Sequence, residues 1–208
     1  NEWRQRVTIA QRQKRIGDIL LLTEEIKNPL IKEEAIAEAG RALASMGRNE
    51  LALNQYRKGL EINGRNPLFR REEAFHLNRL GKVDEAIVKI EAILADTPND
   101  GDAISYLGRI YKAMWVDSWK WVTDPKKRLR TAFDSYHWLI IAINTYLRGY
   151  RVNLNEFYPG VNALTLSTML INLADRFEDR QSPDPEISWV RDNLEDLRGS
   201  LVCALDRN

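Results

Sequence analysis

The segment Pro67–Asp100, PLFRREEAFHLNRLGKVDEAIVKIEAILADTPND, predicts two short helices joined by a tight turn. Apolar residues recur at helical spacing on both sides of Gly81, first at Ala74 and Leu77 and then at Ala86 and Ile90. Gly81 stands where the first helix must end, a position that favours a residue able to adopt a positive φ.

The same pattern recurs about 34 residues earlier and again about 34 residues later. Gly40, Ala74 and Gly108 occupy equivalent positions, and Gly47 corresponds to Gly81. This period, with small residues where two helices touch, is typical of tetratricopeptide repeats. The sequence therefore predicts an all-α fold, a tetratricopeptide-like α-solenoid of about four helix pairs.

The third repeat carries an insertion between its two helices. The trio Ala142, Tyr146 and Gly149 matches a trio of the first repeat, but it comes about 22 residues later than the period requires. We expect a single domain over residues 1–208. Its parts are an N-terminal helical segment at 1–28, two regular repeats at 32–100, a third repeat at 102–150 with its insertion at 116–137, and a fourth helix pair at 157–208. Because the sequence begins at Asn1 without methionine, it is compatible with a fragment of a larger protein.

Composition excludes several classes of protein. Lys and Arg number 31 against 30 Asp and Glu, so a protein whose overall field captures nucleic acid is not expected. No apolar run approaches the ~20 residues that a membrane-spanning helix needs, and we expect a cytoplasmic protein without membrane contact. The single cysteine, Cys203, lies among apolar residues that favour a buried structural thiol.

No catalytic constellation is present in the sequence. His76 and His137 are not at metal-ligand spacing from each other or from Cys203, and no glycine-rich phosphate loop occurs. Carboxylate pairs such as Glu72-Glu73 fall at predicted helix starts, where the helix dipole favours acids. We expect a non-enzymatic protein with no cofactor and no metal.

Cations recur on the predicted groove face of the first helix of each repeat. In this repeat class that helix lines the concave surface. The positions predicted to point into the groove, and thus to bind a partner, include Arg41, Arg71, Phe75, Asn78, Arg79, Arg109 and Lys112. Such a row can bind carboxylates or phosphates. The alternative is a solvated face whose charges are neutralised by acids including Glu38 and Glu72.

Aromatic residues are dense between Tyr106 and Tyr158. Aromatic stripes at helical spacing usually form a core, and this is one interpretation of the region, which includes Trp115. Trp119 and Trp121 lie in the proline-broken insertion, and one helix pair cannot pack all of these tryptophans. Tryptophan beside arginine is also typical of binding hot spots, so both interpretations stay open.

Two motifs resemble a known family. Residues 107–112, LGRIYK, are followed after the insertion by residues 157–163, FYPGVNA. This order is similar to the tetratricopeptide-type TRAF-binding region of apoptosis signal-regulating kinases and its bacterial relatives. The resemblance implies a regulatory docking platform or a sensor module beside an effector, and it points to Arg109, Lys112, Tyr158 and Asn162. The alternative to a binding role for Asn162 is a structural one, as a helix cap or a buried hydrogen-bonding asparagine.

Three functions remain open. The leading hypothesis is a scaffold or adaptor that binds a partner protein or an acidic peptide in the basic groove. The second is a sensor, in a signalling or defence system, that binds an anionic nucleotide-like ligand between Arg109, Lys112, Trp115 and Tyr158 and orders the insertion. The third is stacking of exposed apolar helix faces into a homo-oligomer.

Overall fold

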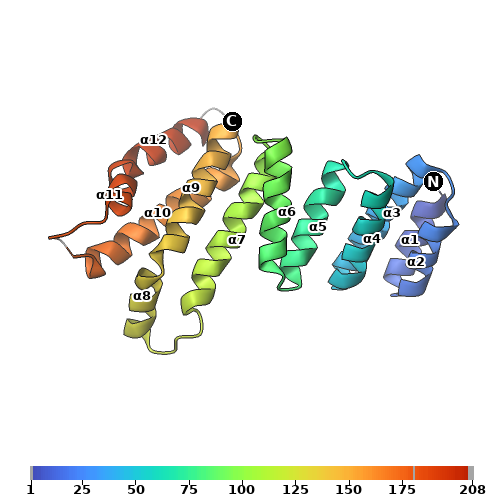
Figure 1. The fold of residues 1–208 in the computed structure, drawn as a ribbon, viewed down its shortest axis with the longest axis horizontal. Helices are drawn as coiled ribbons and strands as arrows, with labels where there is room; N and C mark the ends of the chain where they lie inside the picture. The colour runs from blue at the N-terminus through green and yellow to red at the C-terminus, as the bar shows by residue number, and fades with distance from the viewer. Residues whose placement is uncertain (1, 180, 206–208) are drawn as a thin grey trace. The chain divides into compact units, whose positions relative to one another are not determined.

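The computed structural model describes residues 2–179 and 181–205, and every regular element in these ranges is a helix (Figure 1). The helices are α1 (Glu2–Arg12), α2 (Ile16–Glu25), α3 (Pro29–Ser45), α4 (Asn49–Ile62), α5 (Pro67–Arg79), α6 (Val83–Asp96), α7 (Gly101–Trp119), α8 (Pro125–Asp134), α9 (Tyr136–Val152), α10 (Phe157–Phe177), α11 (Pro185–Asp192) and α12 (Leu194–Leu205). The predicted all-α repeat fold is confirmed. Contacts divide the chain into two compact units, Asn1–Asp96 and Thr97–Asn208.

The first unit contains α1 to α6, and its glycines explain the repeat register. Gly47 and Gly81 adopt φ of 72° and 77° in the turns that end α3 and α5. Gly40 faces the buried Tyr56 ring so closely that a Cβ there would lie 2.4 Å from the ring carbon Cζ. The small residue at the repeat position is thus the contact point of α3 and α4.

Glu73 differs from the sequence interpretation of it as an acid at a helix start. Its side chain lies in the middle of α5, is only 6% exposed, and pairs with cations of both flanking helices. Arg57 of α4 lies 3.0 Å from one carboxylate oxygen and Lys89 of α6 lies 3.0 Å from the other. Glu73 is therefore a structural ion-pair centre that joins α4, α5 and α6.

The second unit contains α7 to α12, and the segment predicted as an insertion is mostly helical. α7 continues to Trp119, four residues beyond the predicted end, and α8 follows after a short turn. α8 begins as helices commonly do: Asp124 accepts a hydrogen bond from the Lys127 amide (2.7 Å), and Pro125 takes the first position. The indole Nε1 of Trp115 donates to the Ala132 carbonyl (2.9 Å), which fixes α8 against α7.

The C-terminal segment differs from the sequence expectation in two ways. One predicted helix from Glu186 onward is two helices, α11 and α12, which are separated at Asn193. The expectation that Cys203 is buried is wrong, because its side chain is exposed on α12. Apolar neighbours in sequence did not decide its burial, because residues adjacent along a helix point to different faces.

Candidate ligand-binding site

The first unit holds the predicted groove residues of α3 and α5. Arg41 is exposed and pairs with Glu38 on its own helix at 2.7 Å. Arg79 is exposed, and its guanidinium carbon lies 5.0 Å from the centre of the half-buried Phe75 ring. Arg71 and Asn78 are half-buried on the same helix. Part of this charge is therefore neutralised locally, as the alternative interpretation of the groove face predicts.

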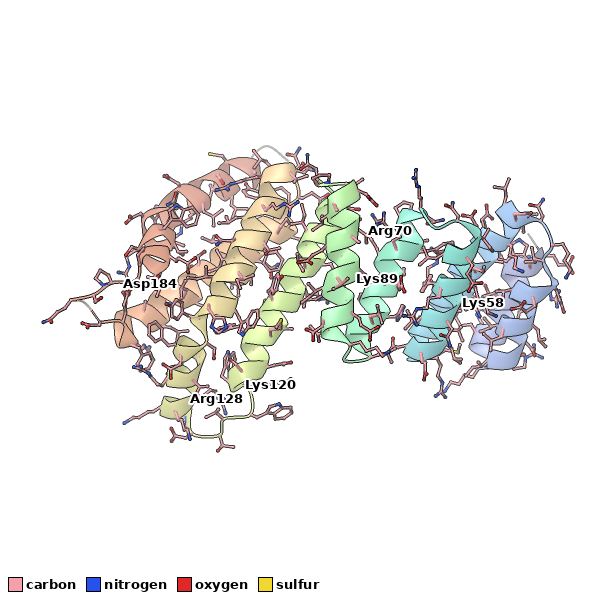
Figure 2. All side chains as sticks on the ribbon, viewed as in Figure 1. Lys58, Arg70, Lys89, Lys120, Arg128 and Asp184 are labelled. Carbon is pink, nitrogen blue, oxygen red and sulfur yellow. The ribbon has the colours of Figure 1, made fainter. Side chains whose placement is uncertain are left out.

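The second unit contains a pocket of about 530 Å³ between α7, α8 and α10, which we call the tryptophan pocket. Its walls are largely apolar and include Trp115, Val116, Trp119, Leu129, Leu166 and Leu173. Three cations also line it, namely Lys112 of α7, Arg128 of α8 and Arg176 of α10. Figure 2 shows Arg128 near the start of α8. Among the described residues, no acid lines the pocket, so its charge is positive although the whole chain is nearly neutral.

A hydrogen-bonded pair closes one part of this pocket. Lys112 Nζ donates to Asn162 Oδ1 at 2.8 Å, and Asn162 Nδ2 donates to the Tyr158 carbonyl at 2.8 Å. Asn162 lies inside α10 and does not cap it; one of its hydrogen bonds joins α10 to α7 and the other lies within α10. The ammonium also lies 5.7 Å from the centre of the Tyr146 ring. Lys112 is thus held in one orientation, with two of its three N–H donors left for other acceptors.

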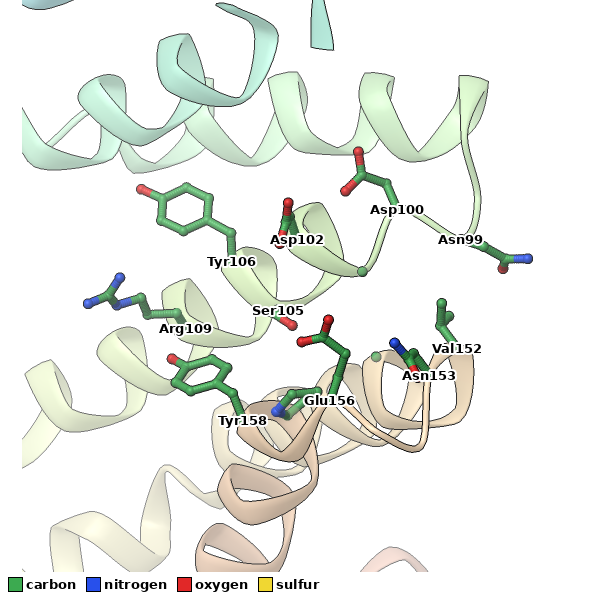
Figure 3. Close-up of a pocket in the computed structure, with 13 residues that line it drawn as sticks. Asn99, Asp100, Asp102, Ser105, Tyr106, Arg109, Val152, Asn153, Glu156 and Tyr158 are labelled. Carbon is green, nitrogen blue, oxygen red and sulfur yellow. The ribbon is translucent and has the colours of Figure 1, made fainter. Parts of the chain in front are cut away.

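Arg109 and Tyr158 line a different pocket from Lys112 and Trp115. This acidic pocket, of about 600 Å³, lies between the start of α7, the end of α9 and the start of α10. In Figure 3, Arg109 and Tyr158 lie at one side of it, while the acidic side chains lie nearer Ser105. These acids are Asp100, Asp102 and Glu156. The four residues of the predicted nucleotide site are therefore divided between two pockets.

The Tyr146 ring lies between these two groups. It is fully buried, contacts the Tyr158 ring edge-on at 6.0 Å, and fills the space beside Gly108, where a Cβ would lie 3.1 Å from it. Burial raises the pKa of Tyr146, so the phenol stays neutral. Tyr146 is a packing residue that holds α9 against both motifs of the predicted site.

Sequence reasoning missed Arg128, Arg176 and the α8 wall of the pocket. The insertion was predicted without a helix, although Asp124-Pro125 is a helix-start signal. The core interpretation of the aromatic residues holds for some of the tryptophans and not for others. Trp115 belongs to the core at 4% exposure, Trp119 is half-buried at the pocket, and Trp121 is 81% exposed. The indole Nε1 of Trp119 is shielded from solvent and has no hydrogen-bond partner in the part of the chain that the structure describes.

Other kinds of site are absent from the described ranges. Within residues 2–179 and 181–205, no three His, Cys, Asp or Glu side chains lie close enough to hold a metal ion together. A search of the same residues found no helix with the length and apolar character needed to span a membrane.

Solved structures of repeat proteins share this fold. A MamA RS-1 ArsTM double mutant matches with a TM-score of 0.53 and 17% identity, over 95% of this chain and 93% of that chain. A thermophilic tetratricopeptide repeat protein of Thermus thermophilus matches with a TM-score of 0.50 and 17% identity, over 83% of this chain and 98% of that chain. No curated protein matches the sequence significantly. At these identities the structures show the fold alone.

The family comparison covers most of the chain. The model described as Tetratricopeptide Repeats-Sensor matches residues 34–167, more than half of the 208 residues. Proteins with such repeats are in general non-enzymatic scaffolds that bind protein partners. The chain is a non-enzymatic repeat protein and belongs to the Tetratricopeptide Repeats-Sensor family.

Proposed function

We propose that this protein is a sensor module that binds a small anionic ligand in the tryptophan pocket. The observation that carries the proposal is the charge of this pocket: Lys112, Arg128 and Arg176 line it, and no acid does among the described residues. An acid-free cationic pocket with apolar walls favours a ligand that joins an anionic group to an apolar or aromatic body. The nucleotide-like ligand predicted from the sequence is one such molecule.

The two sequence motifs support this location. Lys112 ends the LGRIYK motif and Asn162 lies in the FYPGVNA motif, and their side chains form the 2.8 Å hydrogen bond beside the pocket. The motifs that resemble the regulatory region of apoptosis signal-regulating kinases therefore contribute adjacent polar groups. The family description as a sensor agrees with this role.

α8 is the element through which binding would be reported. It supplies Arg128, Leu129 and Ala132 to the pocket wall, so a ligand there contacts α7, α8 and α10 together. A ligand that binds only when α8 is docked stabilises the docked state by mass action. In a signalling or defence system, a linked effector or adaptor protein would then respond to the position of α8.

The proposal is tested by a thermal-shift and calorimetric panel of anions, including nucleotides, sugar phosphates and carboxylates. Lys112→Gln should weaken binding about tenfold or more, because one charge-assisted hydrogen bond contributes about 1.5–3 kcal/mol. Lys126→Gln is the matched control, since Lys126 is an exposed cation of α8 that does not line the pocket. A flat response to the whole panel, or equal losses in both variants, contradicts the proposal.

A second candidate function is capture of an acidic peptide by the first unit. The exposed Arg79 guanidinium on the Phe75 ring is an arrangement that can bind a carboxylate while the ring packs against a side chain. The double variant Arg71→Ala with Arg79→Ala should weaken such a peptide by roughly 1–3 kcal/mol for each desolvated contact. Unchanged affinity in that variant removes this candidate.

A further inference from the structure

We infer that the ligand of the tryptophan pocket is an anionic amphiphile, with one anionic head at Lys112 and an unbranched aliphatic chain along the apolar walls. This inference rests on the proposed function and narrows its ligand class. It follows from three features of the pocket: its largely apolar walls, the length of the pocket face along α10, and the exposed apolar side chains at its edge.

Two of the uncharged polar side chains of the pocket, Asn162 and Thr165, are occupied by bonds within the protein. Thr165 Oγ1 donates to the Val161 carbonyl at 2.8 Å, and Asn162 is bonded to both Lys112 and the Tyr158 carbonyl. A nucleobase and a ribose would bring many donors and acceptors against walls that are largely apolar. An unpaired buried polar group costs about 1–3 kcal/mol, so an apolar body fits these walls better.

The apolar stripe is long and follows the helices. On α7, pocket residues recur at Lys112, Trp115, Val116 and Trp119, one helical face. On α10 the pocket face extends from Val161 to Arg176, fifteen helical steps and thus about 22 Å along the axis. A compact anion would occupy only the Lys112 end of this face. A chain attached to the anion would cover the remainder.

Apolar side chains along the pocket are left in water. Leu129 is 38% exposed, Val161 is 47% exposed and Met169 is 44% exposed, and all three line the pocket. An aliphatic chain laid against them removes this surface from water, which favours binding in proportion to the area covered. The volume of about 530 Å³ lies within the usual range of small-ligand pockets, roughly 300–1,000 Å³.

Lys112 is the best-placed cation for the head. Its ammonium is fixed by Asn162 and the Tyr146 ring and keeps donors available, so little side-chain entropy is lost on binding. Arg128 already donates from Nε to the Val122 carbonyl at 2.6 Å. Part of the Arg128 guanidinium is thus already used within the protein, while Lys112 keeps donors for the head.

The test titrates the full chain with dodecanoate, dodecanol, acetate and ATP, below micellar concentrations, by calorimetry and tryptophan fluorescence. Dodecanoate should bind at least tenfold more tightly than either dodecanol or acetate. Lys112→Gln should reduce dodecanoate affinity to that of dodecanol while leaving dodecanol unchanged. Met169→Glu should weaken dodecanoate at least tenfold, whereas Val88→Glu, at a residue of α6 that is 62% exposed and outside the pocket, should not.

The outcomes separate this inference from the proposed function. If ATP binds and dodecanoate does not, and ATP binding is lost in Lys112→Gln, the inference of an aliphatic ligand is overturned. The proposal of an anion sensor then still stands. Binding of no member of the panel overturns both. Equal dodecanoate affinity in Lys112→Gln and the native chain also overturns the inference. Circular dichroism and thermal unfolding of each variant verify that it is folded.

A last arm identifies the source of the amphiphile. Sedimentation with phosphatidylglycerol vesicles that requires both Lys112 and Met169 supports an amphiphile taken from a bilayer. Dodecanoate binding without vesicle sedimentation supports a free amphiphile. If Lys112→Gln and Met169→Glu both still sediment with the vesicles, and dodecanoate does not bind, the tryptophan pocket is not the binding site.

Discussion

Trp115 and Trp119 lie one helical turn apart but differ in what they contribute. The Trp115 indole is buried and donates to the Ala132 carbonyl, whereas the shielded Trp119 Nε1 has no partner among the described residues. We expect Trp115→Phe to lower the free energy of unfolding by about 1–3 kcal/mol, because it breaks a buried hydrogen bond and reduces packing. Trp119→Phe should cost at least about 1 kcal/mol less, since it removes a donor that pairs with nothing.

Urea denaturation followed by far-UV circular dichroism measures both variants without relying on tryptophan emission. Equal losses of stability in the two phenylalanine variants would show that the Ala132 contact adds nothing to the docking of α8.

Gly40 sets how closely α3 and α4 pack. A Cβ at this position would lie 2.4 Å from Tyr56 Cζ, and the Tyr56 ring is only 1% exposed, so it has no free space to enter. Gly40→Ala should therefore destabilise the first unit by about 1–3 kcal/mol. Gly17→Ala in α2 is the control, because beyond its chain neighbours and the nearby backbone of its own helix no heavy atom lies within 4 Å of the new Cβ. It should be neutral or stabilise by up to about 1 kcal/mol. Equal effects in thermal unfolding would contradict this account of the repeat position.

The close helix contacts at glycine positions could be predicted from the sequence, whereas the polar contacts of the pocket could not. Gly40 and Gly108 are recognisable because a 34-residue repeat places small residues at every close approach of two helices. Lys112 and Asn162 are 50 residues apart in a region where the repeat is broken. No periodic signal relates such positions, so their hydrogen bond could not be predicted from the sequence.

At the scale of elements, α8 was missed because charge and a proline concealed a short helix. Its apolar face is small, and its buried residues are Ala132 and Phe133. Tertiary contacts stabilise it, including the Arg130 guanidinium over the Phe177 ring of α10. A ten-residue helix of this kind is marginal alone, so packing decides it more than propensity does.

A second element-scale contact connects α9 to the start of α11. Tyr136 donates its hydroxyl to Asp184 Oδ2 at 2.5 Å, and Asp184 Oδ1 also accepts from the Glu186 and Ile187 amides. The hydrogen bond raises the pKa of Tyr136 to about 12, and the same bond lowers the pKa of Asp184. Both shifts mean that the bond requires a neutral phenol and an ionised carboxylate.

The pH dependence of stability follows from these two directions. The Tyr136 contribution is fully present below the unfolded pKa of about 10 and is lost as pH rises toward the folded value near 12. The Asp184 contribution is present above the unfolded pKa of about 4 and is lost as pH falls through the lowered folded value. The difference in unfolding free energy between the native chain and Tyr136→Phe should therefore be constant from about pH 5 to 9 and shrink at both extremes.

Urea denaturation of the two proteins across this pH range measures that difference. The native chain should be more stable by on the order of 1 kcal/mol at neutral pH. If this difference in unfolding free energy stays the same at pH values above the folded pKa of Tyr136, the Tyr136–Asp184 hydrogen bond is not its source.

At the scale of the whole molecule, the sequence predicted the class of protein better than its site. Fold and repeat type follow from the 34-residue periodicity, which the two regular repeats at 32–100 and the first helix of the third repeat all share. A binding site depends on which side chains one irregular region brings together. Here the structure combined Lys112, Trp115 and Asn162 with residues that were not predicted, and it assigned Arg109 to another pocket. The groove cations of the first unit remain a separate candidate surface.

The central claim is that the second unit binds an anionic ligand in the tryptophan pocket and that α8 responds. Hydrogen exchange of the full chain, with and without members of the anion panel, tests it most directly, because amide protection maps binding and local stability together. The account predicts slower exchange in α8 and in the pocket-facing turns of α7 and α10, with no change in α3 or α5, and loss of this protection in Lys112→Gln. Protection confined to α3 and α5, or unchanged exchange in α8 when a ligand is bound, would contradict it.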